Sequence, residues 1–177
     1  MSEQRTIEPN TVTNVTIEDM MACREKRAAI QEQYRREFHS TVISFCMNIP
    51  GPVKTNPQIR HAFSQGAHAL VSSLHDKKLR IRAMTELHEV TGDELILCVD
   101  GDASLIKKLT NTIEESHPLG RLFDMDVIGT DGMKLTRGTY RKCIICGCQA
   151  QECARSRKHS VGELQAKIEE LLNQFSI

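Results

Sequence analysis

Apolar residues along the chain form two kinds of pattern, short runs and longer stripes with helical spacing. The run TVISFCMN at 41–48 is rich in β-branched and aromatic residues, which is typical of a buried strand. A second run, ELILCV at 94–99, has the same character, and the turn at 91–93 joins it to a strand-like segment at 82–90. The segment 121–128 completes a set of four predicted strands.

Four helices are predicted between and around these strands. The clearest begins at Asn56-Pro57, because Asn is a good cap and Pro suits the first turn, and it ends near Asp76. Its apolar residues recur at helical spacing, at Ile59, Phe63, Ala67, Leu70 and Leu74. The other helices are expected at 16–38, 103–116 and 160–175, the first and last opened by capping boxes. The inner side of the 103–116 helix should carry Leu105, Ile106, Leu109 and Ile113.

The elements from 41 to 128 follow the order β-α-β-β-α-β, which is the order of the ferredoxin-like fold. We therefore predict an α+β protein in which two helices cover one face of an antiparallel sheet. A hairpin is added to this core, because a turn leads into a short strand at 133–136. A basic, Cys-rich loop then precedes the C-terminal helix. Residues 16–177 are expected to form a single domain, and residues 1–15 a disordered tail.

Composition argues against several classes of protein. Lys and Arg together number 23, as do Asp and Glu, so the whole chain is not built to coat nucleic acid or an anionic membrane. No apolar run approaches the ~20 residues of a membrane-spanning helix. The N-terminus lacks the apolar core of an export signal, which favours a cytoplasmic protein. The seven cysteines are therefore expected to be reduced thiols.

The strand at 121–128 carries candidate chemistry. Side chains alternate along a strand, so Asp124 and Asp126 project from one face, about 6.6 Å apart along the chain. Two such carboxylates suit one or two Mg²⁺ ions, which hold phosphate oxygens. The alternative is that the two aspartates simply form the solvent-exposed face of a half-exposed strand, although Leu122 and Ile128 should share that face. A third carboxylate is expected from one of four acids: Glu86, Glu89, Asp100 or Asp102.

The loop after the first strand, NIPGPVKTNP at 48–57, is a candidate phosphate-binding site. Gly51 lets the backbone approach a ligand, Lys54 adds a positive charge, and the N-terminus of the next helix favours anions. The spacing is not that of a Walker loop. A rigid proline turn beside a solvated lysine is the alternative.

The segment 137–159 combines basic residues with clustered cysteines. Its basic residues outnumber its one acid, Glu152, and suit a polyanion such as a triphosphate. They are Arg137, Arg141, Lys142, Arg155, Arg157 and Lys158. Four soft ligands suit structural zinc, namely Cys143, Cys146, Cys153 and His159. Reduced cysteines that fill the interior of the loop are the alternative, and Cys148 is left over.

Three blocks together resemble the citrate-lyase holo-acyl-carrier-protein synthase family, the apo-citrate lyase phosphoribosyl-dephospho-CoA transferases. The blocks are Asn48-Ile-Pro-Gly-Pro-x-Lys54, Gly120-Arg-Leu-x-Asp-x-Asp-Val127, and Arg141-x-Cys143 to His159. The second block and the Cys153-Ala-Arg-Ser-Arg-x-His159 part of the third are the specific ones. The N-terminal tail lies outside the resemblance.

The resemblance implies a nucleotidyltransferase-type enzyme whose donor is 2′-(5″-triphosphoribosyl)-3′-dephospho-CoA. The acceptor would be a serine of the apo acyl-carrier (γ) subunit of citrate lyase, and pyrophosphate would leave as the serine hydroxyl attacks the α-phosphorus. Two other functions stay open. One is another Mg-dependent nucleotidyltransferase or phosphohydrolase, and the other is a non-enzymatic, zinc-stabilised module that binds RNA or protein.

Set beside that reaction, the residues fall into predicted roles. Asp124 and Asp126 would bind Mg²⁺ and act in catalysis with Arg121, which lies at the entrance of the strand. His159 would be a base, a phosphate ligand or a zinc ligand. The residues expected to bind substrate are Gly51, Lys54, Arg155, Arg157 and His159.

Overall fold

The computed structural model describes residues 14–175, so the predicted tail at 1–15 lies outside the described residues except for its last two positions. Five α-helices, a 3₁₀ turn (η1) and four strands follow one another in this range. In chain order they are α1 Ile17–Phe38, β1 Thr41–Met47, α2 Pro57–Asp76, β2 Arg80–Glu89, β3 Gly92–Asp100, α3 Ala103–Ser116, η1 Gly120–Leu122, β4 Phe123–Ile128, α4 Ala150–Arg155 and α5 Val161–Phe175. None of the helices in the described part of the chain is long and apolar enough to cross a membrane.

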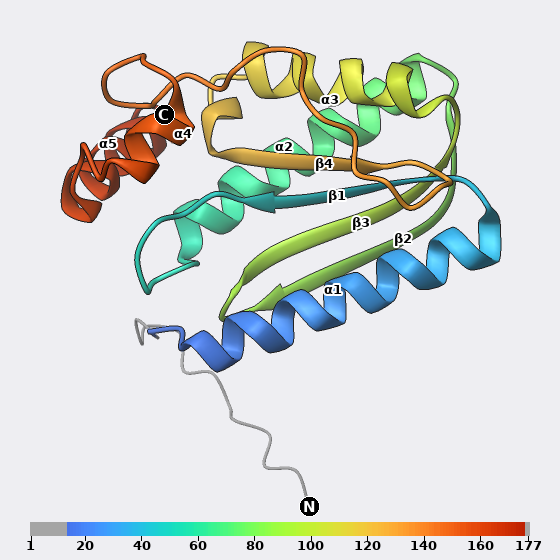
Figure 1. Cartoon of the computed structure of the whole chain (residues 1–177), viewed down its shortest axis with the longest axis horizontal. Helices are drawn as coiled ribbons and strands as arrows, with labels where there is room; N and C mark the ends of the chain where they lie inside the picture. The colour runs from blue at the N-terminus through green and yellow to red at the C-terminus, as the bar shows by residue number, and fades with distance from the viewer. Residues whose placement is uncertain (1–13, 176–177) are drawn as a thin grey trace, which may run out of the picture.

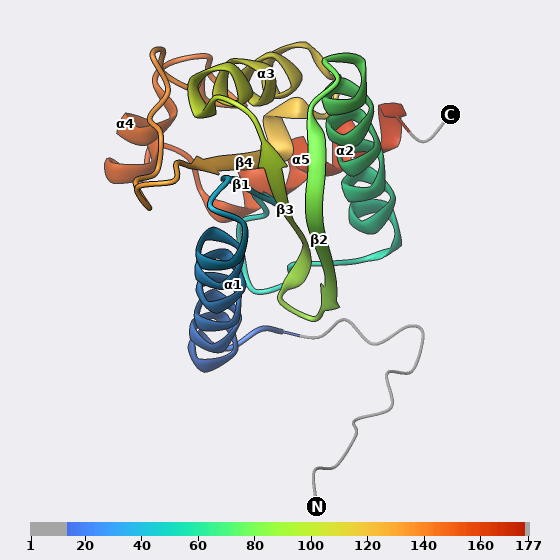
Figure 2. The same ribbon diagram turned by 90° about the vertical axis from the view of Figure 1, so that its right-hand side faces the viewer.

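The four strands form one sheet in the order β2-β3-β1-β4, and every neighbouring pair is antiparallel (Figure 1). Helices α2 and α3 cover one face of this sheet, while α1 lies against the other face (Figure 2). The predicted α+β class is confirmed. The α2 helix has its predicted Asn56 cap with Pro57 in the first turn, and α3 has its predicted bounds.

The main core lies between the sheet and the helices α2 and α3. Three aromatic rings meet there: the Phe45 ring stacks on Phe63 at a centroid distance of 5.0 Å and meets Phe123 edge-on at 5.3 Å. Gly66 of α2 makes this contact possible, because a Cβ atom there would lie 2.6 Å from the Phe45 ring. Close approach of helix and sheet therefore explains the glycine inside a helix, where it is otherwise unfavourable.

The opposite face of the sheet is covered more sparsely. Helix α1 is strongly polar and buries only Cys23 and Tyr34. Its docking includes ionic contacts: Arg27 meets the buried Glu94 at 3.2 Å, and the Cys23 thiol donates to the same carboxylate at 3.0 Å. The β4 end of this face is where the predicted acidic pair lies.

The free edge of β4 is closed by two side chains of α3. Glu114 accepts a hydrogen bond from the Met125 N–H at 2.8 Å, and Lys107 donates to the Met125 carbonyl at 3.0 Å. Arg137 pairs with the other Glu114 oxygen at 3.0 Å. Burial raises the pKa of Glu114, and these cationic and N–H partners oppose that rise. The backbone of Met125 is therefore satisfied by side chains, and farther along this edge the Leu135 N–H donates to the Val127 carbonyl at 2.8 Å.

Several local predictions are wrong. Residues 121–122 belong to η1, so Leu122 enters the main core and does not share the acidic face. The short strand predicted at 133–136 is reduced to one bridge between Ile128 and Lys134. Leu105 is 45% exposed, because α3 turns Lys107, Thr110 and Glu114 inward instead. The Cys-rich loop contains a short helix, α4, that the sequence did not indicate.

The buried contacts of Glu114 predict a clear effect on stability. Replacing Glu114 with Ala leaves the Met125 N–H and the Arg137 charge without their buried partner, so the free energy of unfolding should fall by about 3 kcal/mol. Urea denaturation measures this change. The neighbouring Glu115 also pairs with Arg137 but is exposed, so Glu115→Ala should cost less than about 1 kcal/mol. Equal losses in the two variants would contradict the role given to Glu114.

Candidate functional site

A cavity of about 540 Å³ opens at the end of the sheet where β1 finishes and β4 begins. Its walls are the loop after β1, η1, the Cys-rich segment with α4, and α5. This volume is within the range of small-molecule sites. Segments distant in sequence therefore meet here, and the first three of them carry the three sequence blocks described above.

The lining of the cavity is basic. Arg121, Arg141, Arg157 and His159 contribute to it, and no Asp or Glu side chain does. Burial lowers the pKa of Arg121, and the nearby charges of Arg141 and Arg137 lower it further. A bound anion would offset both effects, because it supplies the opposite charge that these guanidinium groups lack inside the cavity. The cavity is therefore suited to an anionic ligand such as a phosphate chain.

The loop after β1 closes one side of the cavity. Gly51 has φ +86°, and a Cβ atom there would lie 2.5 Å from the Gln165 side-chain nitrogen of α5. Its neighbour Pro50 lines the cavity, whereas Gly51 itself does not. The Lys54 ammonium donates to the Ile49 carbonyl at 2.7 Å, and burial lowers its pKa. Lys54 thus supports the loop from outside the cavity lining.

The two carboxylates lie behind the cavity wall. Asp124 and Asp126 share the α1 face of the sheet, while Met125 between them is buried in the core, as the alternation predicted. Asp126 pairs with Lys134 at 2.5 Å, and Asp124 meets Arg141 at 3.7 Å. Burial and the charge of Asp126 raise the pKa of Asp124. Arg141 joins the two parts of the site, because it both lines the cavity and faces Asp124.

None of the four predicted third carboxylates joins this pair. Asp102 caps α3, and Asp100 bonds to Ser40 and Arg82. Glu86 and Glu89 lie on β2, at the opposite edge of the sheet. The acid that shares a cross-strand row with Asp124, through Cys46, is Glu94, but Arg27 and Cys23 already hold it.

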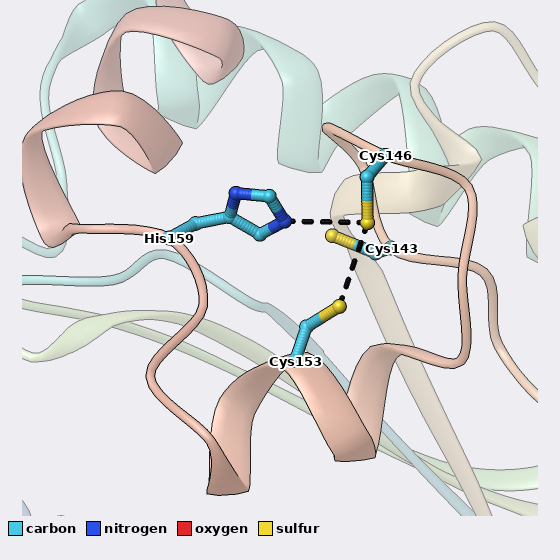
Figure 3. Close-up of side chains that lie close together, drawn as sticks. All are labelled: Cys143, Cys146, Cys153 and His159. Atoms are coloured by element: carbon cyan, nitrogen blue, oxygen red, sulfur yellow. Dashed lines mark hydrogen bonds between the residues drawn. The ribbon is translucent and has the colours of Figure 1, made fainter.

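A metal-ligand cluster forms one end of the cavity (Figure 3). The ligand atoms of Cys143, Cys146, Cys153 and His159 all lie within 4.8 Å of one another. The Cys146 and Cys153 sulfurs are 3.5 Å apart, and His159 Nε2 is 3.3 Å from the Cys146 sulfur. Four such ligands could bind a metal ion. Among residues 14–175, this is the group of His, Cys, Asp or Glu side chains whose ligand atoms lie close enough together to hold one. Cys148 lies outside it.

Local backbone structure explains how the cluster assembles. The segment from Cys143 to Cys148 folds into a tight turn, with hydrogen bonds from Gly147 N–H to the Cys143 carbonyl and from Cys143 N–H to the Cys148 carbonyl. Gly147 takes φ +71°, which glycine adopts without strain. Cys153 comes from α4, and His159 immediately precedes the Ser160 capping box of α5.

The acidities of two cysteines favour a cation in the cluster. Hydrogen bonds from the Cys148 backbone and from His159 lower the pKa of Cys146 to about 5. Burial raises the pKa of Cys153 to about 12, with further contributions from the neighbouring cysteines. Both sulfurs are thiolates together only if a positive charge stabilises them, and a metal ion supplies that charge.

The structure brings together some of the residues singled out from the sequence and separates others. Arg121, Arg157 and His159 line one cavity, whereas Arg155 and Lys54 lie outside its lining. Sequence reasoning counted Arg141 only as one of a basic group, although it bonds to the Phe123 carbonyl of the carboxylate strand and faces Asp124. Its signal was its place two residues before Cys143, within a recognisable block.

Comparison with known sequences decides the family. The family of apo-citrate lyase phosphoribosyl-dephospho-CoA transferases matches residues 15–175. The chain belongs to this family. The predicted resemblance is confirmed, and the matched range contains the basic cavity, the carboxylate pair and the Cys/His cluster.

Individual relatives agree with this assignment. A probable apo-citrate lyase phosphoribosyl-dephospho-CoA transferase of Vibrio cholerae (strain M66-2) is 35% identical over 168 residues, which are 92% of this chain and 94% of the relative. The transferase of that name from Citrobacter koseri is 31% identical over 163 residues, or 90% of this chain and 89% of the relative. The one from Escherichia coli O157:H7 is 32% identical over the same shares of the two chains.

The basic cavity predicts which arginine matters for anion binding. Arg157→Gln should weaken the binding of inorganic pyrophosphate about tenfold or more, because one charge-assisted contact is lost. Lys142→Met, which removes an exposed positive charge outside the lining, should change it by less than about twofold. Isothermal titration of both variants measures the difference. The assignment of the cavity as the anion site would fail if Lys142→Met had the larger effect.

Proposed function

We propose that this protein transfers the 2′-(5″-triphosphoribosyl)-3′-dephospho-CoA precursor to a serine of the acyl-carrier (γ) subunit of citrate lyase, with release of pyrophosphate. Family membership supports the donor and the acceptor, because the relatives carry the name of this transfer. The observation that carries the proposal within the molecule is a cavity with three arginines and no acidic lining residue, which suits the triphosphate of the donor.

The chemistry requires charge neutralisation and alignment more than covalent assistance. The serine oxygen attacks the α-phosphorus, the bond to the departing pyrophosphate breaks, and a phosphodiester remains on the carrier. Arg121 and Arg157 hold the β- and γ-phosphates, where negative charge increases as pyrophosphate leaves. Arg141 lies between these groups and Asp124, so it aligns the α-phosphate with the carboxylate strand.

Asp124 is the candidate acceptor for the serine proton. Its side chain is 45% exposed and therefore accessible to an incoming hydroxyl. Burial and the charge of Asp126 raise its pKa, and a raised pKa makes a carboxylate a better base near neutral pH.

The carboxylate pair also fits Mg²⁺. Mg²⁺ is commonly held by one or two carboxylates and by the phosphates of its substrate, so a third protein ligand is not required. The raised pKa of Asp124 reflects repulsion from Asp126 that a cation relieves. Asp124 and Asp126 would hold the ion, and the ion would supply positive charge to the α-phosphate when bound. Lys134 and Arg141 occupy part of this role in its absence.

We assign the Cys/His cluster to structural zinc. Three thiolates and one imidazole are a common ligand set for closed zinc sites, and His159 is thereby a ligand of the metal. We also assign the sheet to the ferredoxin-like fold, which the strand order β2-β3-β1-β4 supports. A reducing cytoplasm suits a protein whose seven cysteines are free.

The transfer is tested directly by the mass of the carrier. Purified protein is mixed with apo carrier subunit, the triphosphoribosyl donor and Mg²⁺, and the carrier is weighed by intact mass spectrometry. The expected result is a gain equal to the donor minus pyrophosphate. No gain with active reagents would overturn the proposal, and adenylylation of the carrier by ATP to the same extent would favour a broader nucleotidyltransferase.

The carboxylate pair makes a separate prediction. Asp124→Asn and Asp126→Asn should each slow transfer by about 100-fold or more, because they remove charge at the reacting phosphate without changing side-chain shape. Asp76→Asn, at the exposed end of α2, is the matched control and should keep the wild-type rate. Normal rates in both site variants, with an unchanged circular dichroism spectrum, would show that the metal and base roles are wrong.

A further inference from the structure

The Cys/His cluster is part of the wall of the basic cavity. Cys143, Cys153 and His159 belong both to the cluster and to the cavity lining. A structural metal site usually stabilises a region apart from the ligand pocket, but here the two share residues. The state of the cluster must therefore affect the shape of the cavity.

The segment that carries the cluster has almost no hydrophobic core of its own. Between residues 137 and 160 two residues are buried, and both are cysteines of the cluster, Cys143 and Cys153. Helix α4 has six residues, too few to be stable in isolation. Ile144 packs against the main core, and metal ligation is the main force that can order the rest of this segment.

Two arginines of the cavity lie beside ligands of the cluster in sequence. Arg141 precedes Cys143 by two residues, and Arg157 precedes His159 by two residues. Arg157 has φ +49°, a left-handed conformation that is unfavourable for a residue with a side chain and persists only where its surroundings fix it. The Arg141 side chain is also held by the Phe123 and Arg121 carbonyls and faces Asp124, so the arginine whose position depends on its flanking ligand is Arg157.

The rest of the molecule does not depend on the cluster in this way. The main core is built from strands β1, β3 and β4, helices α2 and α3, and residues Ile168 and Leu172 of α5. No cysteine of the cluster belongs to it. Loss of the cluster should therefore disorganise the cavity and leave the sheet and its helices folded.

We propose that the cluster is a thiol-based redox switch for donor binding. This inference rests on the proposed function and on zinc in the cluster. In the reduced form, bound zinc would fix the segment that places Arg157 in the cavity. A peroxide converts Cys146 and Cys153 to a disulfide, and zinc is released. The cavity then no longer binds the triphosphate.

The geometry selects these two sulfurs and the chemistry balances. They lie 3.5 Å apart, and Cys146 is exposed to an oxidant. The two thiolates give one electron each to hydrogen peroxide, an S–S bond forms and the O–O bond breaks. Two protons from solvent complete two water molecules, and Zn²⁺ is released. A thiol reductant together with added Zn²⁺ reverses the step.

The experiment compares three states of the full chain in the presence of saturating Mg²⁺: reduced and zinc-loaded, oxidised with hydrogen peroxide, and reduced again with added Zn²⁺. Released zinc is measured with a chromogenic chelator, donor binding by isothermal titration, and transfer by the mass of the carrier. Oxidation should release about one zinc ion per chain and weaken donor binding at least about tenfold. Reduction with zinc should restore both, and the circular dichroism spectrum should keep its sheet and helix signal.

Cys148→Ser is the matched control, because Cys148 is an exposed cysteine two residues from Cys146 but outside the cluster. It should release zinc and lose donor binding on oxidation as the wild type does. Unchanged donor binding after zinc has left, or protection by Cys148→Ser, would overturn the switch while the proposed function stands. Failure of the reduced, zinc-loaded protein to label the carrier would instead overturn the proposed function.

Discussion

The contact on which this site depends is made by the Arg141 guanidinium at the beginning of β4. It donates hydrogen bonds to the Phe123 and Arg121 carbonyls, faces the Asp124 carboxylate at 3.7 Å, and lines the basic cavity. The planar guanidinium has five donors in a fixed fork, so it can bond to two backbone carbonyls and face a carboxylate at once. Arg141 thereby ties the Cys-rich segment to the sheet and places positive charge between the carboxylates and the cavity.

The sheet itself supplies the fixed frame for that contact. β4 is an edge strand, and Glu114 and Lys107 hold the backbone of Met125 between the two aspartates. The aspartates therefore project from a strand whose edge is closed on one side and paired with β1 on the other. Arginines line the cavity, the carboxylates lie outside its lining, and Arg141 contacts both parts. Such a separation suits phosphoryl transfer, in which cations neutralise phosphate oxygens while a base faces the attacking group.

Local patterns predicted much of this molecule, and long-range contacts account for what they missed. The capping residues and apolar stripes predicted α2 and α3, and the alternation of side chains along a strand predicted that Asp124 and Asp126 share one face. Leu122 and Leu105 were misplaced, because η1 and the inward polar stripe of α3 arise from contacts with other elements. The stripe of Lys107, Thr110 and Glu114 was visible at helical spacing, but nothing in the sequence indicated that it meets a strand edge. The spacing of the cysteines and His159 suggested a metal cluster, whereas its position in the cavity wall required the fold.

The central claim is that a basic cavity walled by a metal cluster holds the triphosphate of the donor. A crystal structure with a non-hydrolysable donor analogue, with anomalous data collected at the zinc absorption edge, tests it most directly. We predict a zinc peak among Cys143, Cys146, Cys153 and His159, and triphosphate density within hydrogen-bond distance of Arg121, Arg141 and Arg157. A triphosphate bound away from these arginines, or a zinc peak elsewhere, would contradict the account.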